Sequence, residues 1–392
     1  MEQIPRVTHD IFRASLENSF RGYDPFDGLN SRFFNVVPFL KRGIFGLAWI
    51  QFHKRSIVNL RRLLLVPEKR NPKGVALFIL GMLEQYKHSS DPQLLKECEY
   101  LADWLLSQVS DPGEWGHACW GYHFDWNARA FFVPRGKPNV ITTIYVAQAL
   151  YRIGTELKRQ EYIDASFDAA NFIVKTLYVE EGGRRFFAYI PGEAAFVHNA
   201  SLWGSAWVAF VANETGNEKY SALALSVARQ SISEQASDGS WVYGSRHHHQ
   251  FIDGFHTGYN LEALDMLRTS LGTSEFDGAI AKGYEYYKDQ LFEKNGLAKY
   301  YSNNPYPLDM HSVSQAIITF IKVGGGASDY SMAEKVINWS ISELYMSDKK
   351  RFVYQKTKHF VNKTNYTRWT QAWVYYSFSY YCRKLAEQNE KD

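Results

Sequence analysis

The chain has few cysteines and no long apolar run, and both features restrict its class. Its three cysteines, Cys98, Cys119 and Cys382, are far apart and lack the spacing of metal ligands. This argues against a disulfide framework and against a structural zinc site, and it fits a reducing compartment. No window holds about 18 uninterrupted apolar residues, so we expect no membrane-spanning helix.

An excess of charge of either sign is also absent. The 44 Lys and Arg residues and the 41 Asp and Glu residues give a net charge of +3, which is too balanced for a dedicated nucleic-acid binder. The residues that follow Met1 lack the basic and apolar stretches of a secretory signal, so we expect a cytoplasmic protein. GxGxxG, Walker A, HExxH and GxSxG motifs are missing as well, and we expect neither a cofactor nor a bound metal.

Aromatic residues, in contrast, are abundant. The chain has 11 Trp, 26 Tyr and 26 Phe, together 16% of its residues. The hydrophobic content of 45% and the charged content of 22% are ordinary for a folded globular protein. The aromatic residues are therefore numerous enough to fill a core and also to line a large cavity.

The sequence repeats a helical pattern in which a polar and aromatic cluster is followed by an apolar stretch. The repeats start near Gly74, Asn139, Asn199, Phe255, His311 and Thr367. One-sided amphipathic segments lie between them, at residues 93–108, 161–177, 218–234, 275–291 and 330–344. Because no helix pair can bury its apolar face alone, the pattern predicts an all-α fold, an (α/α)6 toroid with an inner and an outer ring of helices. It makes residues 1–392 one domain, with a cap and loop at residues 1–35 and a sixth outer helix at residues 44–65.

In such a toroid the N-terminal ends of the inner helices meet at one mouth, and the sequence places chemically active side chains there. Converging helix N-termini favour a bound anion, and Tyr and Trp offer flat faces to a sugar ring. We therefore expect the ligand to be a saccharide or oligosaccharide, with an acidic one favoured.

A uronyl epimerase or lyase needs a base for the proton beside the carboxylate, and cations or amides to hold the developing charge. We predict Tyr259 and His256 as base and acid, oriented by Asp253 or His311. The predicted substrate-binding residues are Trp120, Tyr122, Arg129, His198, Asn199, Trp241, Asn260, Arg368 and Trp369, with Asp24, Asp27 and Asn30 from an N-terminal loop.

Each of these residues also has a structural interpretation. Any one of the aromatic residues is also explained as core, Asp253 as a helix N-cap, and the loop around Asp24 as a plain turn. The run His247-His-His249 looks like a metal cluster, but neighbouring side chains on a loop point apart.

Several strings resemble the VpsJ-like polysaccharide-biosynthesis proteins. They are Gly22-Tyr-Asp-Pro-Phe-Asp-Gly-Leu-Asn-Ser31, Trp120-Gly-Tyr-His-Phe-Asp-Trp126, Val197-His-Asn-Ala200, the stretch from Ile252 to Leu264, and Arg368-Trp-Thr-Gln-Ala-Trp373. The resemblance implies an α/α-toroid fold and a role in exopolysaccharide or capsule production. It implies no particular reaction.

Two other functions remain open. A glycoside hydrolase needs two carboxylates beside the bond, for which Asp125 with Asp253 or Asp309 would serve. A non-catalytic glycan-binding scaffold at a membrane face would use the stretch from Lys41 to Arg70, where basic residues alternate with apolar runs. A solvated outer helix explains that stretch equally.

Overall fold

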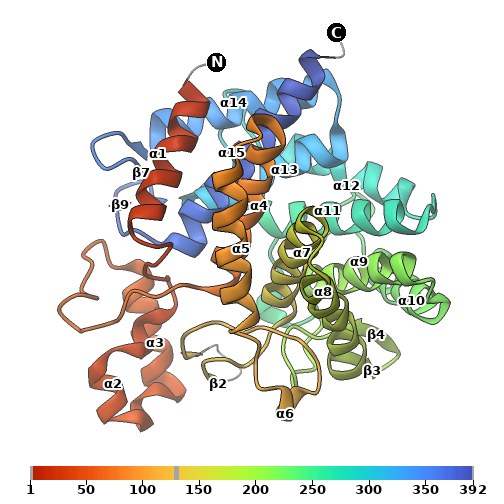
Figure 1. Ribbon diagram of the computed structural model, residues 1–392, viewed down its shortest axis with the longest axis horizontal. Helices are drawn as coiled ribbons and strands as arrows, with labels where there is room; N and C mark the ends of the chain where they lie inside the picture. The colour runs from red at the N-terminus through yellow and green to blue at the C-terminus, as the bar shows by residue number, and fades with distance from the viewer. Residues whose placement is uncertain (1–2, 128–131, 391–392) are drawn as a thin grey trace.

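The computed structural model describes residues 3–127 and 132–390, and most of them belong to helices (Figure 1). The inner helices are α4 (Pro72–Ser89), α7 (Val140–Leu157), α9 (His198–Thr215), α11 (Gly254–Leu271), α13 (Met310–Thr319) and α15 (Ala372–Asn389). The outer helices are α1 (Gln3–Glu17), α5 (Pro92–Leu106), α8 (Gln160–Phe172), α10 (Glu218–Ser233), α12 (Asp277–Gln290) and α14 (Ala327–Leu344).

The predicted toroid is confirmed by the contacts among these helices. Each inner helix packs against the next, from α4 through α7, α9, α11 and α13 to α15, and α15 packs against α4, so that the ring closes. Each of α4, α7, α9, α11 and α13 also contacts the outer helix that follows it in the sequence.

The sixth outer helix is α1, and its prediction at residues 44–65 is wrong. α1 packs against α15, and the ring of Phe12 stacks on that of Tyr375 with their centroids 5.2 Å apart. Figure 1 shows α1 beside α15, with both termini on the same side of the molecule. Ile4, Val7 and Ile11 form a buried apolar stripe on α1. Residues 3–17 are therefore a helix of the outer ring and not part of the expected cap and loop.

Residues 27–55 form a small unit outside the ring. It consists of η1 (Asp27–Asn30), α2 (Arg32–Val36), η2 (Pro38–Lys41) and α3 (Gly43–Arg55). α3 packs against η1 and the strand β1 (Trp126–Asn127). Leu29, Phe34 and Ile50 make a core cluster of their own, separate from the main one. This unit is therefore a satellite fastened to the loops at one end of the toroid.

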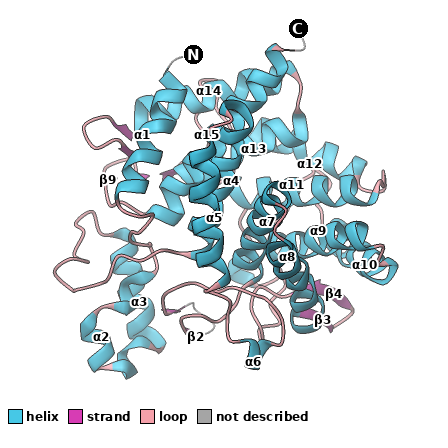
Figure 2. Cartoon of the chain, viewed as in Figure 1, coloured by secondary structure: helices cyan, strands magenta, loops and turns pink. Residues whose placement is uncertain are grey.

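Strands are short and lie in the loops between helices (Figure 2). The antiparallel pairs are β1 with β2 (Phe132–Val133), β3 (Tyr178–Glu181) with β4 (Arg184–Phe187), and β6 (Tyr345–Met346) with β7 (Arg351–Phe352). β5 (Leu308–Asp309), β8 (Gln355–Lys356) and β9 (Val361–Asn362) form a three-stranded antiparallel sheet in the order β5-β8-β9. The remaining short helices are α6 (Pro112–Trp115), η3 (Ile173–Leu177), η4 (His247–His249), η5 (Phe320–Gly324) and η6 (Thr367–Gln371).

Side-chain caps fix where four of the six inner helices begin. The side chain of Asn71 accepts from the backbone N–H groups of Lys73 and Gly74 at the start of α4. Asn139 caps α7, Asp253 caps α11, and Asp309 caps α13 in the same way. Such caps satisfy backbone donors that have no partner within the helix. Because the starts are fixed, the residues of each first turn face the same mouth.

The core fills the space between the two rings and extends into the inner ring. Trp207 is buried between α9 and α8, where its indole N–H donates to the carbonyl of Ser166. Trp373 is buried inside the inner ring, beside Tyr259 and His311. Gly81 lets α4 and α15 approach closely, because a Cβ atom at this position would lie 2.7 Å from the ring of Tyr375. Among the described residues, no helix is long and apolar enough to cross a membrane.

Candidate active site

A cavity of about 420 Å³ opens at the N-terminal ends of the inner helices. Its volume lies in the range of small-molecule sites, roughly 300–1,000 Å³. Every inner helix or its leading turn contributes to the wall, through Lys73, Ile141, Asn199, His256, His311 and Trp369. A wider depression of about 1120 Å³ lies beside α5 and α6, but it holds none of the predicted catalytic residues.

The most unusual group in the cavity is a chain of three buried polar side chains. Nζ of Lys73 donates a hydrogen bond to the hydroxyl oxygen of Tyr259 at 3.0 Å. The same hydroxyl lies 2.9 Å from Nε2 of His311. No carboxylate among the described residues forms an ion pair with Lys73, and Nδ1 of His311 has no hydrogen-bond partner among them. We call these three residues the relay.

Burial disfavours the charged form of each relay residue. It lowers the pKa of Lys73 well below its ordinary value, and the nearby charge of Arg368 adds to this effect. It also lowers the pKa of His311 and raises that of Tyr259 well above its usual range. Since Lys73 donates to the phenol oxygen, the phenol hydrogen is free to be donated to Nε2 of His311. The relay therefore joins three groups that can exchange a proton and whose charged forms are disfavoured by burial.

A second acid–base pair lies at the start of α11, the helix that carries Tyr259. Nδ1 of His256 is 2.7 Å from Oδ2 of Asp253, while Oδ1 of Asp253 accepts the backbone N–H of His256 at 2.8 Å. Asp253 is therefore both the cap of α11 and the group that orients the imidazole. Both residues line the cavity, and the ring centroids of His256 and Tyr259 are 6.3 Å apart. Two proton-exchanging groups thus face the same small volume.

The cavity contains one further lysine without a carboxylate partner. Lys54 of α3 lies 4.9 Å from the ring centroid of Phe26 and 5.9 Å from that of Trp369, and it makes no ion pair with any residue in the described ranges. Burial lowers its pKa, against the attraction of Asp309. The two arginines of the wall are already paired: Arg368 holds Asp24 through two hydrogen bonds of 2.5 and 2.8 Å, and Arg246 forms an ion pair with Glu193.

Aromatic rings form much of the wall, including Phe26, Tyr122, Trp126, Tyr189, Tyr243, Phe255, Tyr300 and Trp369. The indole N–H of Trp369 is held by both carboxylate oxygens of Asp309, at 3.1 and 3.2 Å. The ring of Trp369 also packs edge-on against His311, with centroids 4.7 Å apart. The orientation of this ring is thus fixed before any ligand binds.

The structure brings most of the predicted catalytic residues together. Tyr259, His256, Asp253 and His311 line the cavity, as do Tyr122, Asn199, Arg368 and Trp369 of the predicted binding set. Asp125 does not. It pairs with Lys41 at 2.7 Å and accepts the backbone N–H of Arg135, in a separate depression. The proposed pairing of Asp125 with Asp253 or Asp309 is therefore not formed in this cavity.

Trp120 and Trp241 are core residues rather than stacking platforms, contrary to the prediction. Both are nearly inaccessible, with exposed fractions of 0% and 2%. Trp120 donates its indole N–H to the carbonyl of Leu105 on α5, and Trp241 donates to that of Ser231 on α10. Each ring packs beneath the outer helix of the preceding hairpin, so neither face is available to a sugar.

His198 and Asn260 also lie behind the wall. Both are buried and neither lines the cavity. Burial lowers the pKa of His198 to about 4, so its imidazole is neutral, and its ring packs against that of Phe196. Contact of either side chain with a ligand in this cavity would require a change of conformation. Arg129 lies outside the described residues.

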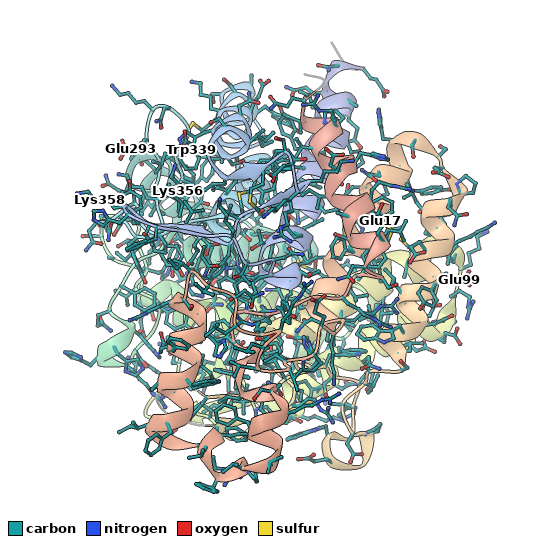
Figure 3. All side chains as sticks on the ribbon, turned by 90° about the vertical axis from the view of Figure 1, so that its left-hand side faces the viewer. Glu17, Glu99, Glu293, Trp339, Lys356 and Lys358 are labelled. Atoms are coloured by element: carbon teal, nitrogen blue, oxygen red, sulfur yellow. The ribbon has the colours of Figure 1, made fainter. Side chains whose placement is uncertain are left out.

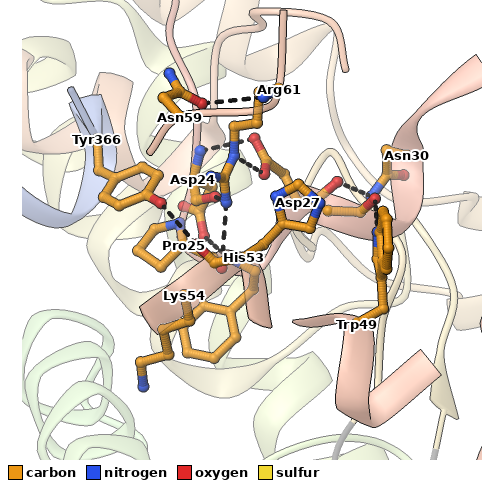
Figure 4. A network of polar contacts seen from close by, with 12 residues as sticks. Asp24, Pro25, Asp27, Asn30, Trp49, His53, Lys54, Asn59, Arg61 and Tyr366 are labelled. Atoms are coloured by element: carbon orange, nitrogen blue, oxygen red, sulfur yellow. Dashed lines mark hydrogen bonds and ion pairs between the residues drawn. The ribbon is translucent and has the colours of Figure 1, made fainter. Parts of the chain in front are cut away.

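The side chains of Asp24, Asp27 and Asn30 bind other parts of the protein and do not line the cavity (Figure 4). The guanidinium of Arg61 donates to Oδ1 of Asp27 at 2.6 Å and to the carbonyl of Asp24 at 2.9 Å. The side chain of Asn30 bonds to the backbone of Asp125 in both directions. Together with the ion pair between Arg368 and Asp24, these contacts form a buried network. We call its four residues, Asp24, Asp27, Arg61 and Arg368, the clamp. The predicted binding role of the three loop residues is therefore not supported by their geometry.

Sequence reasoning missed Lys73 and Lys54. Lys73 is the second residue of α4, just before the position from which the apolar stretch was counted. A signal was present, since a lone lysine directly after an N-cap asparagine and ahead of a wholly apolar helix has no solvated face to occupy. Lys54 gave no such signal, because it stands beside Arg55 in a stretch rich in basic residues.

Comparison with known proteins gives the fold. No family model and no curated protein matches the chain, so the resemblance to the VpsJ-like proteins rests on the quoted strings alone. Solved structures do match. They include a sugar epimerase from a ruminal bacterium (TM-score 0.62, 13% identity, covering 82% of this chain and 90% of that one). A cellobiose 2-epimerase from Bacillus thermoamylovorans gives a TM-score of 0.63 at 10% identity, covering 82% and 90% of the two chains.

An unsaturated glucuronyl hydrolase specific for heparin matches over almost the whole length. Its TM-score is 0.63 at 10% identity, with 99% of this chain and 97% of that chain covered. At such identities the likeness shows a shared architecture and no more. The chain is an α/α-toroid.

Proposed function

We propose that the protein modifies an acidic saccharide by removing a proton from a carbon beside a carboxylate or carbonyl, as a uronyl epimerase or lyase does. The observation that carries this proposal is the relay: a buried tyrosine held between a lysine and a histidine, neither of which is paired with a carboxylate among the described residues. The names of the structural neighbours, which are sugar epimerases and an unsaturated glucuronyl hydrolase, support a sugar as the substrate.

Tyr259 is the group that meets the substrate proton. A free phenolate is unfavourable here because burial raises the pKa of Tyr259. The phenol can nevertheless act as a base if its own proton moves to Nε2 of His311 as its oxygen takes the proton from carbon. The C–H bond and the phenol O–H bond break, a new O–H and an N–H bond form, and the electron pair of the C–H bond passes into the enolate.

The negative charge of the enolate needs a cation. Lys54 is the lysine of the wall that has neither a carboxylate nor a phenol as partner, and a protonated ammonium there would stabilise this charge most strongly when water is excluded. A bound carboxylate would also raise the pKa of Lys54 and favour its protonated form. Return of a proton to carbon from His256 completes an epimerisation, and loss of a leaving group from the adjacent carbon completes an elimination.

The setting we propose is the synthesis of a surface polysaccharide. It is supported by the strings that resemble the VpsJ-like proteins, which extend from Gly22 to Trp373. A hydrolase that uses Asp125 together with Asp253 or Asp309 is not favoured, because Asp125 lies in a separate depression from the cavity.

The test is exchange of the substrate proton. Incubation with uronate-containing oligosaccharides in deuterated water is expected to place deuterium at the carbon beside the carboxylate if the reaction is an epimerisation, or to form an unsaturated uronate if it is an elimination; NMR detects both. Tyr259→Phe is expected to reduce the exchange rate by roughly 10²–10⁴-fold, the usual contribution of general acid–base catalysis. The matched control is Tyr287→Phe on α12, which removes a hydroxyl from an equally buried tyrosine outside the cavity.

Two outcomes would contradict the proposal. Tight binding of an acidic glycan with neither exchange nor elimination would favour the scaffold function. New reducing ends with no exchange and no unsaturated uronate would indicate a hydrolase.

A further inference from the structure

Large apolar side chains are exposed mainly on one short segment. Among the described residues, twelve large hydrophobic side chains are exposed, and nine of them fall between residues 36 and 65. They are Val36, Phe39, Ile44, Phe45, Phe52, Ile57, Val58, Leu63 and Leu65. Ile44 is 81% exposed and Leu63 is 79% exposed. Exposed apolar side chains concentrated in one segment of a folded protein indicate an interaction site, whereas scattered single ones do not.

The same segment is strongly basic. Residues 31–70 contain nine Lys and Arg residues and a single acidic residue, Glu68. Of the basic side chains, Arg32, Arg42, Arg55 and Arg62 are exposed among the apolar ones. The chain as a whole is nearly neutral, at +3. Positive charge is therefore concentrated where the apolar side chains are exposed.

The β8–β9 hairpin lies against this segment. The side-chain amide of Asn362 donates to the carbonyl of Ser56 at 2.9 Å. The hairpin carries Phe360, which is also exposed, and two lysines, Lys356 and Lys358. Figure 3, which turns this side toward the viewer, shows both lysines above the helices of the satellite unit. We call the exposed side chains of residues 36–65 together with Phe360 the docking face.

The docking face is held firmly rather than loosely attached. Arg61 is buried and anchors its C-terminal part through Asp27, and the indole N–H of Trp49 donates to the carbonyl of Gly28 at 3.1 Å. The segment is linked to the toroid through Asp24, whose carbonyl accepts from Arg61 and whose carboxylate pairs with Arg368, so its backbone is held while the apolar side chains stay exposed (Figure 4).

We propose that the docking face binds the surface of a lipid bilayer that contains anionic lipids. The apolar side chains would enter the boundary between headgroups and acyl chains, while the arginines contact lipid phosphates and carboxylates. A protein partner would account for the apolar side chains, but the charge of the segment, nine basic residues against one acidic residue, matches a continuous anionic surface such as a bilayer with anionic lipids. A nucleic acid would leave the exposed aliphatic side chains in water.

Docking would also orient the cavity. Lys54 belongs to α3, which contributes Ile44, Phe45 and Phe52 to the docking face. Lys54 itself lines the cavity. A bilayer bound at α3 would therefore lie close to the mouth of the cavity. This proposal does not depend on the chemistry at Tyr259, so the two can fail separately.

The experiment is flotation of the full chain with vesicles. One set consists of phosphatidylcholine alone, and the other contains phosphatidylcholine mixed with phosphatidylglycerol, each at low and at high salt. We expect binding to the anionic vesicles that weakens roughly tenfold or more at high salt, because exposed charges are screened beyond about 3 Å at 1 M ionic strength. Equal binding to both vesicle types, or binding to neither, would overturn the proposal.

Two variants separate the contributions. Ile44→Asp combined with Phe45→Asp is expected to abolish flotation, whereas Tyr100→Asp combined with Ser342→Asp, with the same change of charge elsewhere on the surface, is expected to leave it intact. Arg42→Glu combined with Arg55→Glu is expected to remove the preference for anionic vesicles, and a retained preference would contradict the role of the arginines. Light scattering completes the test: a dimer of the unaltered chain that Ile44→Asp and Phe45→Asp convert to a monomer would mean that a second copy covers this face instead.

Discussion

Two buried polar clusters lie next to each other at the mouth of the toroid, and they handle charge in opposite ways. In the clamp, Arg368 is bound to Asp24 and Arg61 to Asp27, so that every cation has a carboxylate partner. In the relay, Lys73, Tyr259 and His311 bond to one another and to no carboxylate. The clamp holds its protons firmly, whereas the relay can pass one along.

The pKa values of the buried cations Arg368 and Lys73 are shifted in opposite directions. Burial disfavours the charged form in both clusters. In the clamp, the attraction of Asp24 outweighs burial and raises the pKa of Arg368. In the relay nothing outweighs burial, and the pKa of Lys73 falls well below its ordinary value. A buried paired charge is thus suited to holding structure, and a buried unpaired amine to exchanging protons.

Breaking the relay should affect chemistry more than folding. Lys73→Met removes the donor to the Tyr259 hydroxyl and replaces a buried amine with an apolar side chain of similar length. We expect the rate of proton exchange to fall by roughly 10²–10³-fold, with the melting temperature unchanged or slightly higher, since a buried polar group is lost. Kinetics of deuterium exchange and thermal unfolding measure the two effects.

The control for this variant is a half-buried lysine. Lys322 forms an ion pair with Glu262 at 2.6 Å and lies outside the cavity. Lys322→Met leaves the buried Glu262 without its cation and with only the amide of Gln315 as a donor, so it should destabilise the fold while the exchange rate of the folded protein stays the same. If Lys73→Met behaved like Lys322→Met, the relay would be a structural element and the contrast between the clusters would not hold.

Breaking the clamp should have the reverse result. Asp24→Ala leaves the guanidinium of Arg368 buried without its carboxylate. Loss of one partner of a buried ion pair typically costs about 3–5 kcal/mol, and we expect a decrease of this size in the free energy of unfolding, measured by urea denaturation. Asp24→Asn keeps a hydrogen-bond acceptor and should cost less. A loss below about 1 kcal/mol for Asp24→Ala would show that Arg368 finds another partner or water.

The elements that the sequence predicted best are those that repeat. Inner helices were expected to start near Asn139, Phe255 and His311, and they start within one residue of these positions. A pattern repeated six times averages out local exceptions, and Asn139, Asp253 and Asp309 mark these three starts independently as caps. The N-terminal helix was missed because its outer position in the ring depends on contacts with α15, at the other end of the chain.

Side-chain roles were harder to predict than helices. Asp24 and Arg368 are 344 residues apart in the sequence, and nothing local indicates that they pair. Trp120 and Trp241 stand before inner helices, as residues of the mouth would, but their indole N–H groups find carbonyls on the preceding outer helix. The relay illustrates the same limit, since Tyr259 and His311 were expected at the mouth while Lys73, which completes the group, was not.

Asp309 offers the smallest and most specific test of the comparison, because it is a buried carboxylate that no cation pairs directly. It caps α13 beside His311 and holds Trp369 and Gln355. Burial raises its pKa from 3.8 to about 6, against the effect of these hydrogen bonds. The folded protein then binds the proton more tightly than the unfolded chain between these two values. The stabilising contribution of Asp309 is therefore complete below about pH 4 and is lost as the pH rises through 6.

Between pH 4 and pH 6 we expect the contribution of Asp309 to the free energy of unfolding to decrease by at most about 3 kcal/mol. Chemical denaturation at a series of pH values measures this decrease. Asp309→Asn, which cannot ionise, should remove this component of the pH dependence, and an unchanged profile would place the carboxylate in a better solvated environment than its burial implies.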